Sequence, residues 1–211
     1  LHLRLRPIGM RKEGQRFLAL LERGHELDQQ PRTLKARFAH EAGLVHGEVP
    51  SVFPAEKQEQ LQKVLAQLGF EAGVDRAYIF TFDQEGEFFD NTMEWCAPGV
   101  EPQLQHLHRV PAAEYPWWME RIHAGQWIQV EDISKLPRTA VRERTVLEAQ
   151  DIRAVLAAPL VVEKSTVGWV GFEETKSTRI WHGQDTEVLA KLKKLFEEAL
   201  RPVARELARA P

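Results

Sequence analysis

Residues 152–173 read IRAVLAAPLVVEKSTVGWVGFE and contain the longest apolar runs of the chain. The first run, residues 152–162, is rich in valine, which is typical of a largely buried strand. Pro159 near its end indicates an edge position or a bulge, because proline has no N–H for a sheet ladder. Lys164 and Ser165 turn the chain into residues 166–173, where Gly168 and Gly171 indicate close backbone approach. The stretch therefore predicts two buried strands joined by a short turn.

The segments on either side supply the other predicted elements. Apolar residues recur at helical spacing in residues 55–69, and two strand-like runs, residues 76–82 and 88–95, flank the polar break DQEG. Further helices are expected at residues 111–124, 139–150 and 184–210, with a short strand at 127–130 and a turn at 132–137. This order excludes regular βαβ alternation and predicts an α+β fold around an antiparallel sheet.

The chain divides into three predicted regions. Residues 1–54 are expected to form an N-terminal helical extension, with two short helices in residues 8–43, and a linker rich in glycine and proline. Residues 55–200 form the main domain, and residues 201–211 are the end of the last helix, leading to an output domain beyond Pro211. Because the first residue is Leu1 rather than Met, we expect the chain to be a fragment of a larger protein.

Composition excludes several classes of protein. The 211 residues are 43% hydrophobic and 9% aromatic, which is too apolar for a disordered chain. The net charge is −3, so no strong field exists to hold a nucleic acid or an anionic membrane. No apolar run approaches the roughly 20 residues of a membrane span. Cys96 is the single cysteine, so an internal disulfide and a cysteine-based zinc site are excluded. We therefore expect a cytoplasmic protein.

Several short motifs, in this order and spacing, resemble those of a GAF domain. They are Asn91-Thr92-x-Glu94-Trp95-Cys96, Pro116-Trp117-Trp118, Val130-Glu131-Asp132-Ile133-Ser134-x-Leu136-Pro137, Glu148 to Arg153, Leu156 to Leu160, Val167 to Phe172 and Trp181-x-x-x-Asp185. The likeness covers about residues 56–200 and is greatest to GAF modules of bacterial sensor histidine kinases and diguanylate cyclases. It implies an antiparallel sheet with the first and last helices on one face and a small-molecule pocket on the other.

Signatures of catalysis and of resident cofactors are missing from the sequence. His40 begins a zinc-helix pattern, but Leu44 stands where the second histidine is required. Neither a Gly-x-Ser-x-Gly elbow nor a phosphate-binding glycine loop is present. The bilin attachment of some family members does not carry over to this chain, because their attachment cysteine follows the third strand whereas Cys96 is expected on the second. We therefore predict a regulatory domain with no catalytic residue, no cofactor and no bound metal.

The resemblance would bring nine residues toward one ligand cavity, with aromatic walls and a few polar groups. These are Asn91, Glu94, Trp95, Trp117, Trp118, Ile128, Asp132, Glu148 and Ile152. Purely structural alternatives stay open for these residues. The two adjacent tryptophans would then cap the sheet, and Asp132 and Glu148 would be helix-cap or surface carboxylates. A metal or haem role for the histidines at 106, 108 and 123 is the minor alternative to solvated side chains.

The last helix carries a second pattern. Leu189, Leu192, Phe196, Ala199 and Val203 advance by alternating steps of three and four, as in a coiled-coil seam, and predict a homodimer through the terminal helices. The alternative is that this stripe packs on the sheet of its own chain. Pro202 is expected to kink or end the helix.

The functional prediction is a small-molecule sensor for signal transduction in a two-component system. A ligand would settle in the pocket and bias the packing of the terminal helices, which lead to a kinase or cyclase output domain. The alternative is a non-catalytic dimerisation module whose cavity is filled by its own side chains.

Overall fold

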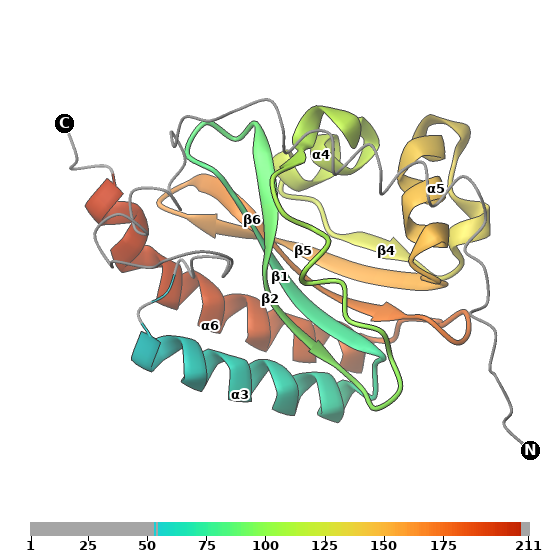
Figure 1. Cartoon of the computed structure of the whole chain (residues 1–211), viewed down its shortest axis with the longest axis horizontal. Coiled ribbons are helices and arrows are strands. Elements are labelled where there is room, and N and C mark those ends of the chain that lie inside the picture. Colours follow the sequence, from blue (N-terminus) through green and yellow to red (C-terminus); the bar gives the residue numbers. More distant parts are fainter. Residues whose placement is uncertain (1–52, 54, 208–211) are drawn as a thin grey trace, which may run out of the picture.

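The computed structural model describes residue 53 and residues 55–207, so the predicted helices of residues 8–43 and most of the predicted linker lie outside the described residues. In the described part, one curled antiparallel sheet lies between two layers of helices (Figure 1). Helices α3 (Ala55–Ala72) and α6 (Gly183–Leu207) cover one face, and α4 (Pro116–His123) and α5 (Val141–Ala149) lie over the other. The predicted α+β architecture is confirmed.

The sheet has six strands in the described residues, in the order β3-β2-β1-β6-β5-β4, and every neighbouring pair is antiparallel. The strands are β1 (Arg76–Phe82), β2 (Phe88–Cys96), β3 (Val110–Pro111), β4 (Ile128–Val130), β5 (Ala154–Val162) and β6 (Ser165–Glu174). Five of them were expected. The two-residue β3, which pairs with the start of β2, was missed because so short a segment has no periodicity.

The apolar stretch of residues 152–173 forms most of the β5–β6 hairpin. Pro159 lies beyond the end of β4, whose pairing with β5 stops at Ala157, so its missing N–H leaves no gap in that ladder. A register irregularity follows between Leu160 and Val161, as the proline predicted. Gly168 has a φ of +154°, and a Cβ there would lie 2.0 Å from the carbonyl oxygen of Phe80. The close backbone approach predicted for this glycine is therefore confirmed.

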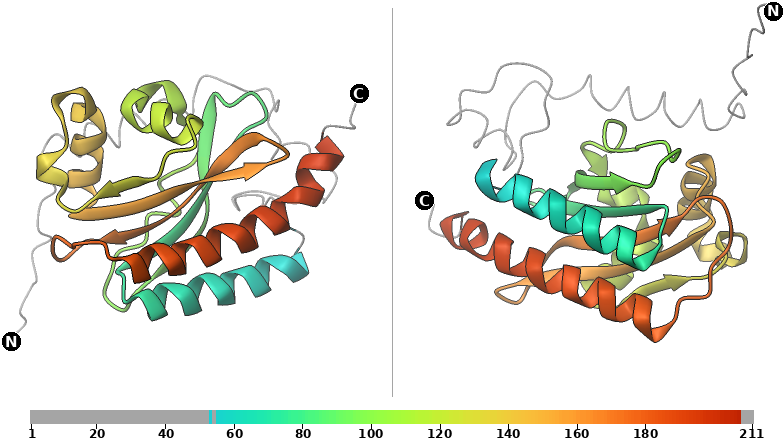
Figure 2. Two further views of the ribbon diagram at one scale, coloured as in Figure 1. Left: turned by 180° about the vertical axis from the view of Figure 1, so that it is seen from behind. Right: turned by 90° about the horizontal axis from the view of Figure 1, so that it is seen from below.

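Helices α3 and α6 lie side by side beneath the sheet (Figure 2). The stripe that suggested a coiled coil is buried inside the chain: Leu189, Leu192 and Phe196 are fully covered, and Ala199 and Val203 nearly so. Most of the stripe joins side chains of β5, β6 and α3 in one apolar core. The seam that predicted the dimer is thus occupied by the chain's own sheet.

Helix α6 continues past Pro202 to Leu207, so the prediction that the helix could end there is wrong. Pro202 is exposed. Solvent can therefore hydrate the carbonyl one turn earlier that the missing N–H leaves without an intrahelical partner.

On the opposite face the connecting helices are shorter than predicted. Residues 111–124 were expected to be one helix, but α4 begins only at Pro116, after β3 and a short 3-10 turn (Ala112–Glu114). The proline occupies the first helical position, where its missing N–H is not needed. Likewise α5 begins at Val141, after the 3-10 turn Arg138–Ala140. These segments and the alternate strand residues that face them form a second apolar core.

Candidate functional site

A narrow cavity lies between the sheet and the segments that carry α4 and α5, on the face opposite α3 and α6. Its volume is about 60 Å³. That space holds a few water-sized molecules, so a larger ligand needs the walls to move. The walls are formed by Arg76, Tyr78, Phe80, Phe89, Asn91, Glu94, Gln103, Leu107, Tyr115, Trp118, Glu143, Val146, Leu147, Gln150, Trp169 and Glu173.

One side of the cavity is a cluster of aromatic rings from four elements. Trp169 of β6 stacks on Phe80 of β1, with ring centroids 4.7 Å apart, and contacts Phe89 of β2 at 4.9 Å. Trp118 of α4 lies 6.3 Å from Trp169. Because strand side chains alternate between faces, the wall residues on β1 and β6 are separated by core residues that face α3 and α6.

The floor of the cavity carries a buried ion pair. Arg76 Nη1 donates to Glu173 Oε2 at 2.8 Å, and both side chains are more than nine-tenths buried. Burial raises the pKa of the Glu173 carboxyl to about 7, against the opposing charge of Arg76 and with the help of the Glu94 carboxylate. A buried glutamic acid that titrates near neutrality is typical of functional sites.

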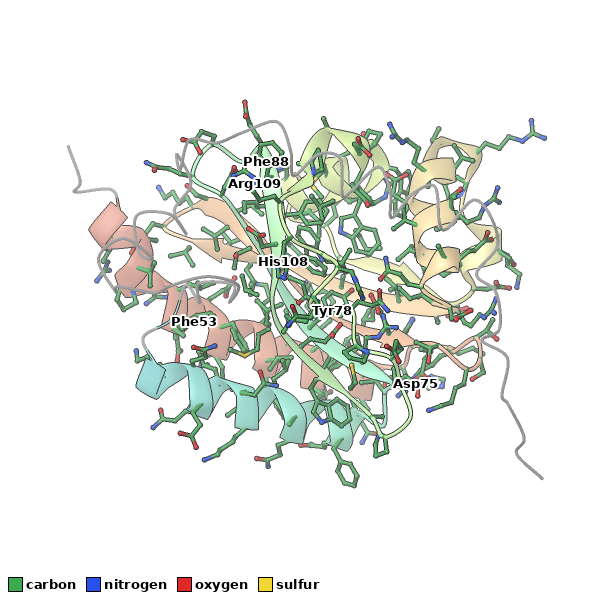
Figure 3. All side chains as sticks on the ribbon, viewed as in Figure 1. Phe53, Asp75, Tyr78, Phe88, His108 and Arg109 are labelled. Carbon is green, nitrogen blue, oxygen red and sulfur yellow. The ribbon has the colours of Figure 1, made fainter. Side chains whose placement is uncertain are left out.

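Tyr78 lines the same cavity as this pair and lies near the middle of the view in Figure 3. Burial and the neighbouring Glu173 carboxylate raise the pKa of its hydroxyl well above the usual value, so the phenol remains protonated. The ring lies across Gly171 of β6, where a Cβ would approach the tyrosine oxygen to 2.3 Å. The second predicted close approach is therefore made by a side chain, and glycine is needed for Tyr78 to lie there.

A β-bulge turns two polar residues of β2 toward the same cavity. Ile79 pairs with Met93 but Phe80 pairs with Asn91, so Thr92 is an extra residue on β2. Its hydroxyl donates to the Ile79 carbonyl at 3.1 Å. The extra residue shifts the alternation, so that Asn91 and Glu94, three positions apart, both line the cavity. Glu94 accepts backbone N–H bonds from residues 103 and 104, at 2.8 and 3.0 Å, which hold the β2–β3 connection over the cavity.

Glu143 of α5 joins the two helices that cover the cavity. Its Oε1 accepts the backbone N–H groups of Trp117 and Trp118 at 2.8 and 3.2 Å, and thereby satisfies the first turn of α4. The residue is only 1% exposed. Its Oε2 has no hydrogen-bond partner among the described residues, and neither has the Trp118 Nε1–H. An unpaired buried carboxylate oxygen in a cavity wall marks a place for a hydrogen-bond donor.

Of the nine predicted ligand residues, the structure brings Asn91, Glu94 and Trp118 together in the cavity wall. Trp117 packs beside them, half-buried, with the Arg121 guanidinium 3.8 Å above its ring. Ile128 and Ile152 are buried in the core on the same side of the sheet but do not line the cavity.

The other three predicted residues lie elsewhere. Trp95 faces α3, where its ring would meet a Cβ on Gly69 at 2.5 Å, because neighbouring residues of a strand face opposite sides of the sheet and Glu94 faces the cavity. Asp132 precedes a 3-10 turn (Ile133–Lys135) and accepts the Ser134 N–H at 3.0 Å, which is the helix-cap alternative. Glu148 is exposed on α5.

Sequence reasoning missed three of the charged groups: Arg76, Glu143 and Glu173. Arg76 and Glu173 could have been recognised from the sequence, because each lies near the end of an otherwise apolar strand, on the same side as an aromatic neighbour. A charged residue in such a position points into the interior. Glu143 had none, since helix α5 is polar on most of its surface and only packing against α4 buries this side chain.

Two of the histidines singled out from the sequence have identifiable neighbours, and the described residues contain no metal-ligating group of three. His108 Nδ1 lies 3.7 Å from Asp90, and His123 stacks on Phe82. Burial, with the Glu94 carboxylate, raises the pKa of the Cys96 thiol to about 12, so the sulfur is protonated at neutral pH. Among the described helices, none has the length and apolar character needed to cross a bilayer.

Comparisons with known proteins agree with this architecture. The chain is 30% identical over 175 residues to the methanogenesis regulatory histidine kinase FilI of Methanothrix harundinacea, which covers 80% of the chain but only 18% of the kinase. The chain therefore spans less than a fifth of that relative's length.

Two solved structures share the fold. One is the domain of a two-component sensor histidine kinase protein from Sinorhizobium meliloti 1021, 17% identical, with a TM-score of 0.57 over 74% of this chain and 99% of that one. The other is the GAF3 domain of Slr1393 from Synechocystis sp. PCC6803, in its photoproduct state, 20% identical, with a TM-score of 0.58 over 72% and 97%. The GAF domain family model matches residues 56–209, somewhat beyond the predicted 56–200. This chain is a member of the GAF domain family.

Proposed function

We propose that this chain is a sensory GAF module that binds a small molecule in the cavity and transmits its occupancy through α3 and α6. The output is a kinase-type domain elsewhere in the same protein. The observation that carries the proposal is the cavity itself, because it combines aromatic walls with a buried carboxylate oxygen, Glu143 Oε2, that has no partner among the described residues.

The sheet supplies a physical route from the cavity to the helices. On β1, Tyr78 faces the cavity and the next residue, Ile79, packs in the core of α3 and α6. On β6, Glu173 faces the cavity and the preceding residue, Phe172, packs in the same core. A ligand that shifts these strands must therefore repack the helix layer, and it acts only as far as it binds one arrangement better than the other, about 1–3 kcal/mol in typical couplings.

The kinase output is supported by the relative from Methanothrix harundinacea, whose remaining length lies outside the matched region. A cyclase output stays a prediction of the sequence resemblance. The regulatory, non-catalytic character is part of the proposal, and the absence of substrate turnover by the purified chain tests it. The cytoplasmic location also stays a prediction.

The homodimer has no support from the stripe of α6, because most of that stripe is buried against the chain's own sheet and α3. A dimer would need the outer surfaces of the terminal helices, where Leu195 of α6 is 40% exposed. Light scattering on the purified chain measures its mass directly and decides this part of the proposal.

A thermal-shift screen against a metabolite library tests the sensor proposal. A ligand at 100 times its dissociation constant adds about 2.7 kcal/mol. For a domain of this size that is a rise of roughly 5–10 °C in Tm.

The matched variants are Leu147→Trp, which fills the cavity from α5, and Val141→Trp, which adds the same bulk at an exposed position of the same helix. We expect the shift to survive in V141W and to vanish in L147W. Hits that shift both variants equally, or the lack of any hit, would contradict a sensory cavity here. Faster or slower hydrogen exchange in α3 and α6 on ligand addition tests the transmission.

A further inference from the structure

The charged groups that line the cavity do not balance. Three of them are carboxylates, Glu94, Glu143 and Glu173, and one is a guanidinium, Arg76. Arg76 is already committed to Glu173 at 2.8 Å. Glu94 and Glu143 have no cationic partner in the wall, and bind backbone N–H groups instead. Even with Glu173 protonated, the wall therefore bears more negative than positive charge.

The hydrogen-bonding capacity points the same way. Glu143 Oε2 is a buried acceptor with no donor among the described residues. Leaving such an oxygen unpaired is unfavourable, and an anionic ligand would increase the penalty by repulsion. A ligand with a charged N–H donor removes it. The unpaired donors nearby, Arg76 Nε and Trp118 Nε1, require an acceptor atom, which a neutral part of the same ligand can supply, because the Arg76 guanidinium is already in contact with Glu173 at 2.8 Å.

The aromatic rings add a third argument. Six aromatic rings line the cavity, and the faces of such rings attract cations that have lost their water. They are those of Tyr78, Phe80, Phe89, Tyr115, Trp118 and Trp169. A cavity lined by such rings and by a carboxylate favours an organic cation over a neutral molecule of the same shape.

We infer that the ligand is a small organic cation, a protonated amine or amidine, that donates to Glu143 Oε2 and places its charge among these rings. The inference rests on the proposed function, since it names the chemical class of the molecule sensed in that cavity. An anion such as a carboxylate or a phosphate is the class that the cavity rejects.

Acetamidinium, acetamide and acetate test the inference, because they have nearly the same shape and differ in charge, and they are small enough for a narrow cavity. Each is titrated into the isotope-labelled 211-residue chain, and binding is followed by the indole N–H signals of its six tryptophans. We expect acetamidinium to bind at least about ten-fold more tightly than acetamide, about 1.4 kcal/mol, and acetate not to bind.

The variant Glu143→Gln keeps an oxygen for the α4 N–H groups and removes the charge. The control Glu148→Gln removes an exposed charge from the same helix. We expect E143Q to lose the preference for acetamidinium, and E148Q to retain it.

Equal or tighter binding of acetamide or acetate would overturn the cation assignment, as would a preference that persists in E143Q or the absence of binding by all three probes. These outcomes leave the sensor proposal standing if the metabolite screen yields a neutral or anionic ligand that L147W excludes. If the metabolite screen yields no ligand as well, both the cation assignment and the sensor proposal fail.

Discussion

Replacement of Glu143 by alanine tests the interpretation of how the cavity is covered. The side chain is 1% exposed and reaches from α5 to the first turn of α4, across 26 positions of sequence. Alanine removes the acceptor of two backbone N–H groups that lie where water has little access. We therefore expect a large loss of stability from a residue whose sequence context is that of an ordinary surface helix.

The magnitude follows from the two hydrogen bonds. Their lengths are 2.8 and 3.2 Å, and bonds to a charged acceptor contribute about 1.5–3 kcal/mol each. Because the second is long, we take the lower part of this range and expect the free energy of unfolding to fall by about 3–4 kcal/mol. Glutamine retains one acceptor oxygen, so E143Q should lose only about 1 kcal/mol.

Urea unfolding followed by tryptophan fluorescence measures both losses, with Glu148→Ala as the control. Glu148 is exposed on the same helix, and its removal should change stability by no more than about 0.5 kcal/mol. If E143A unfolds within about 1 kcal/mol of the parent, or if glutamine is no better than alanine at this position, the Glu143 carboxylate does not hold α4 against α5.

Three further predictions concern the rest of the fold. Gly168→Ala should lower stability by about 3 kcal/mol or more, because its Cβ would meet the Phe80 carbonyl oxygen at 2.0 Å. Gly183→Ala, with open space around the new Cβ, should not lower it. Equal unfolding midpoints for the two variants would contradict this prediction. Burial opposes ionisation of Asp75, but hydrogen bonds from Lys176 and Thr175 outweigh it and lower the pKa from 3.8 to about 2. The stabilisation by this carboxylate is therefore complete above about pH 4 and is lost as the pH falls toward 2. Between about pH 5 and 3 the free energy of unfolding, measured in urea, should decline less for Asp75→Asn than for the parent chain. Phe196→Ala should reduce the stability of the monomer by about 3–5 kcal/mol, because the ring is fully buried. If the substitution dissociates a dimer and leaves the unfolding of the monomer unchanged, the coiled-coil interpretation of α6 is correct instead.

The order of the elements could be predicted from the sequence because the patterns that encode it are local. Their content of aromatic and β-branched residues identified the strands of residues 76–82 and 152–162 within a few positions of their observed limits. Where a pattern was weak, the prediction was less accurate. The helix predicted for residues 111–124 overlaps the end of β3, and the observed helix α4 begins five residues later than expected. The stripe of α6 was recognised, but periodicity is the same for a helix that packs on its own sheet and for one that packs on a partner.

The cavity was only partly predictable because its residues meet through strand register. The family resemblance supplied Asn91 and Glu94, and the bulge at Thr92 is what turns both toward the cavity while Trp95 faces α3. A one-residue shift in register exchanges the two faces of a strand, and nothing in the local pattern of residues 88–95 specifies that shift.

Most helices and strands, the antiparallel sheet and the family could be predicted from the sequence, since apolar periodicity and motif spacing act over short distances along the chain, whereas the two-residue β3 has no such pattern. Only the tertiary structure decided which polar groups share the cavity. Arg76 and Glu173 are 97 positions apart, and Glu143 and Trp117 are 26 apart. Their contacts depend on how the strands pair and how α5 lies against α4. The burial that raises the pKa of Glu173 and leaves Glu143 Oε2 without a partner among the described residues exists only once those elements have packed together.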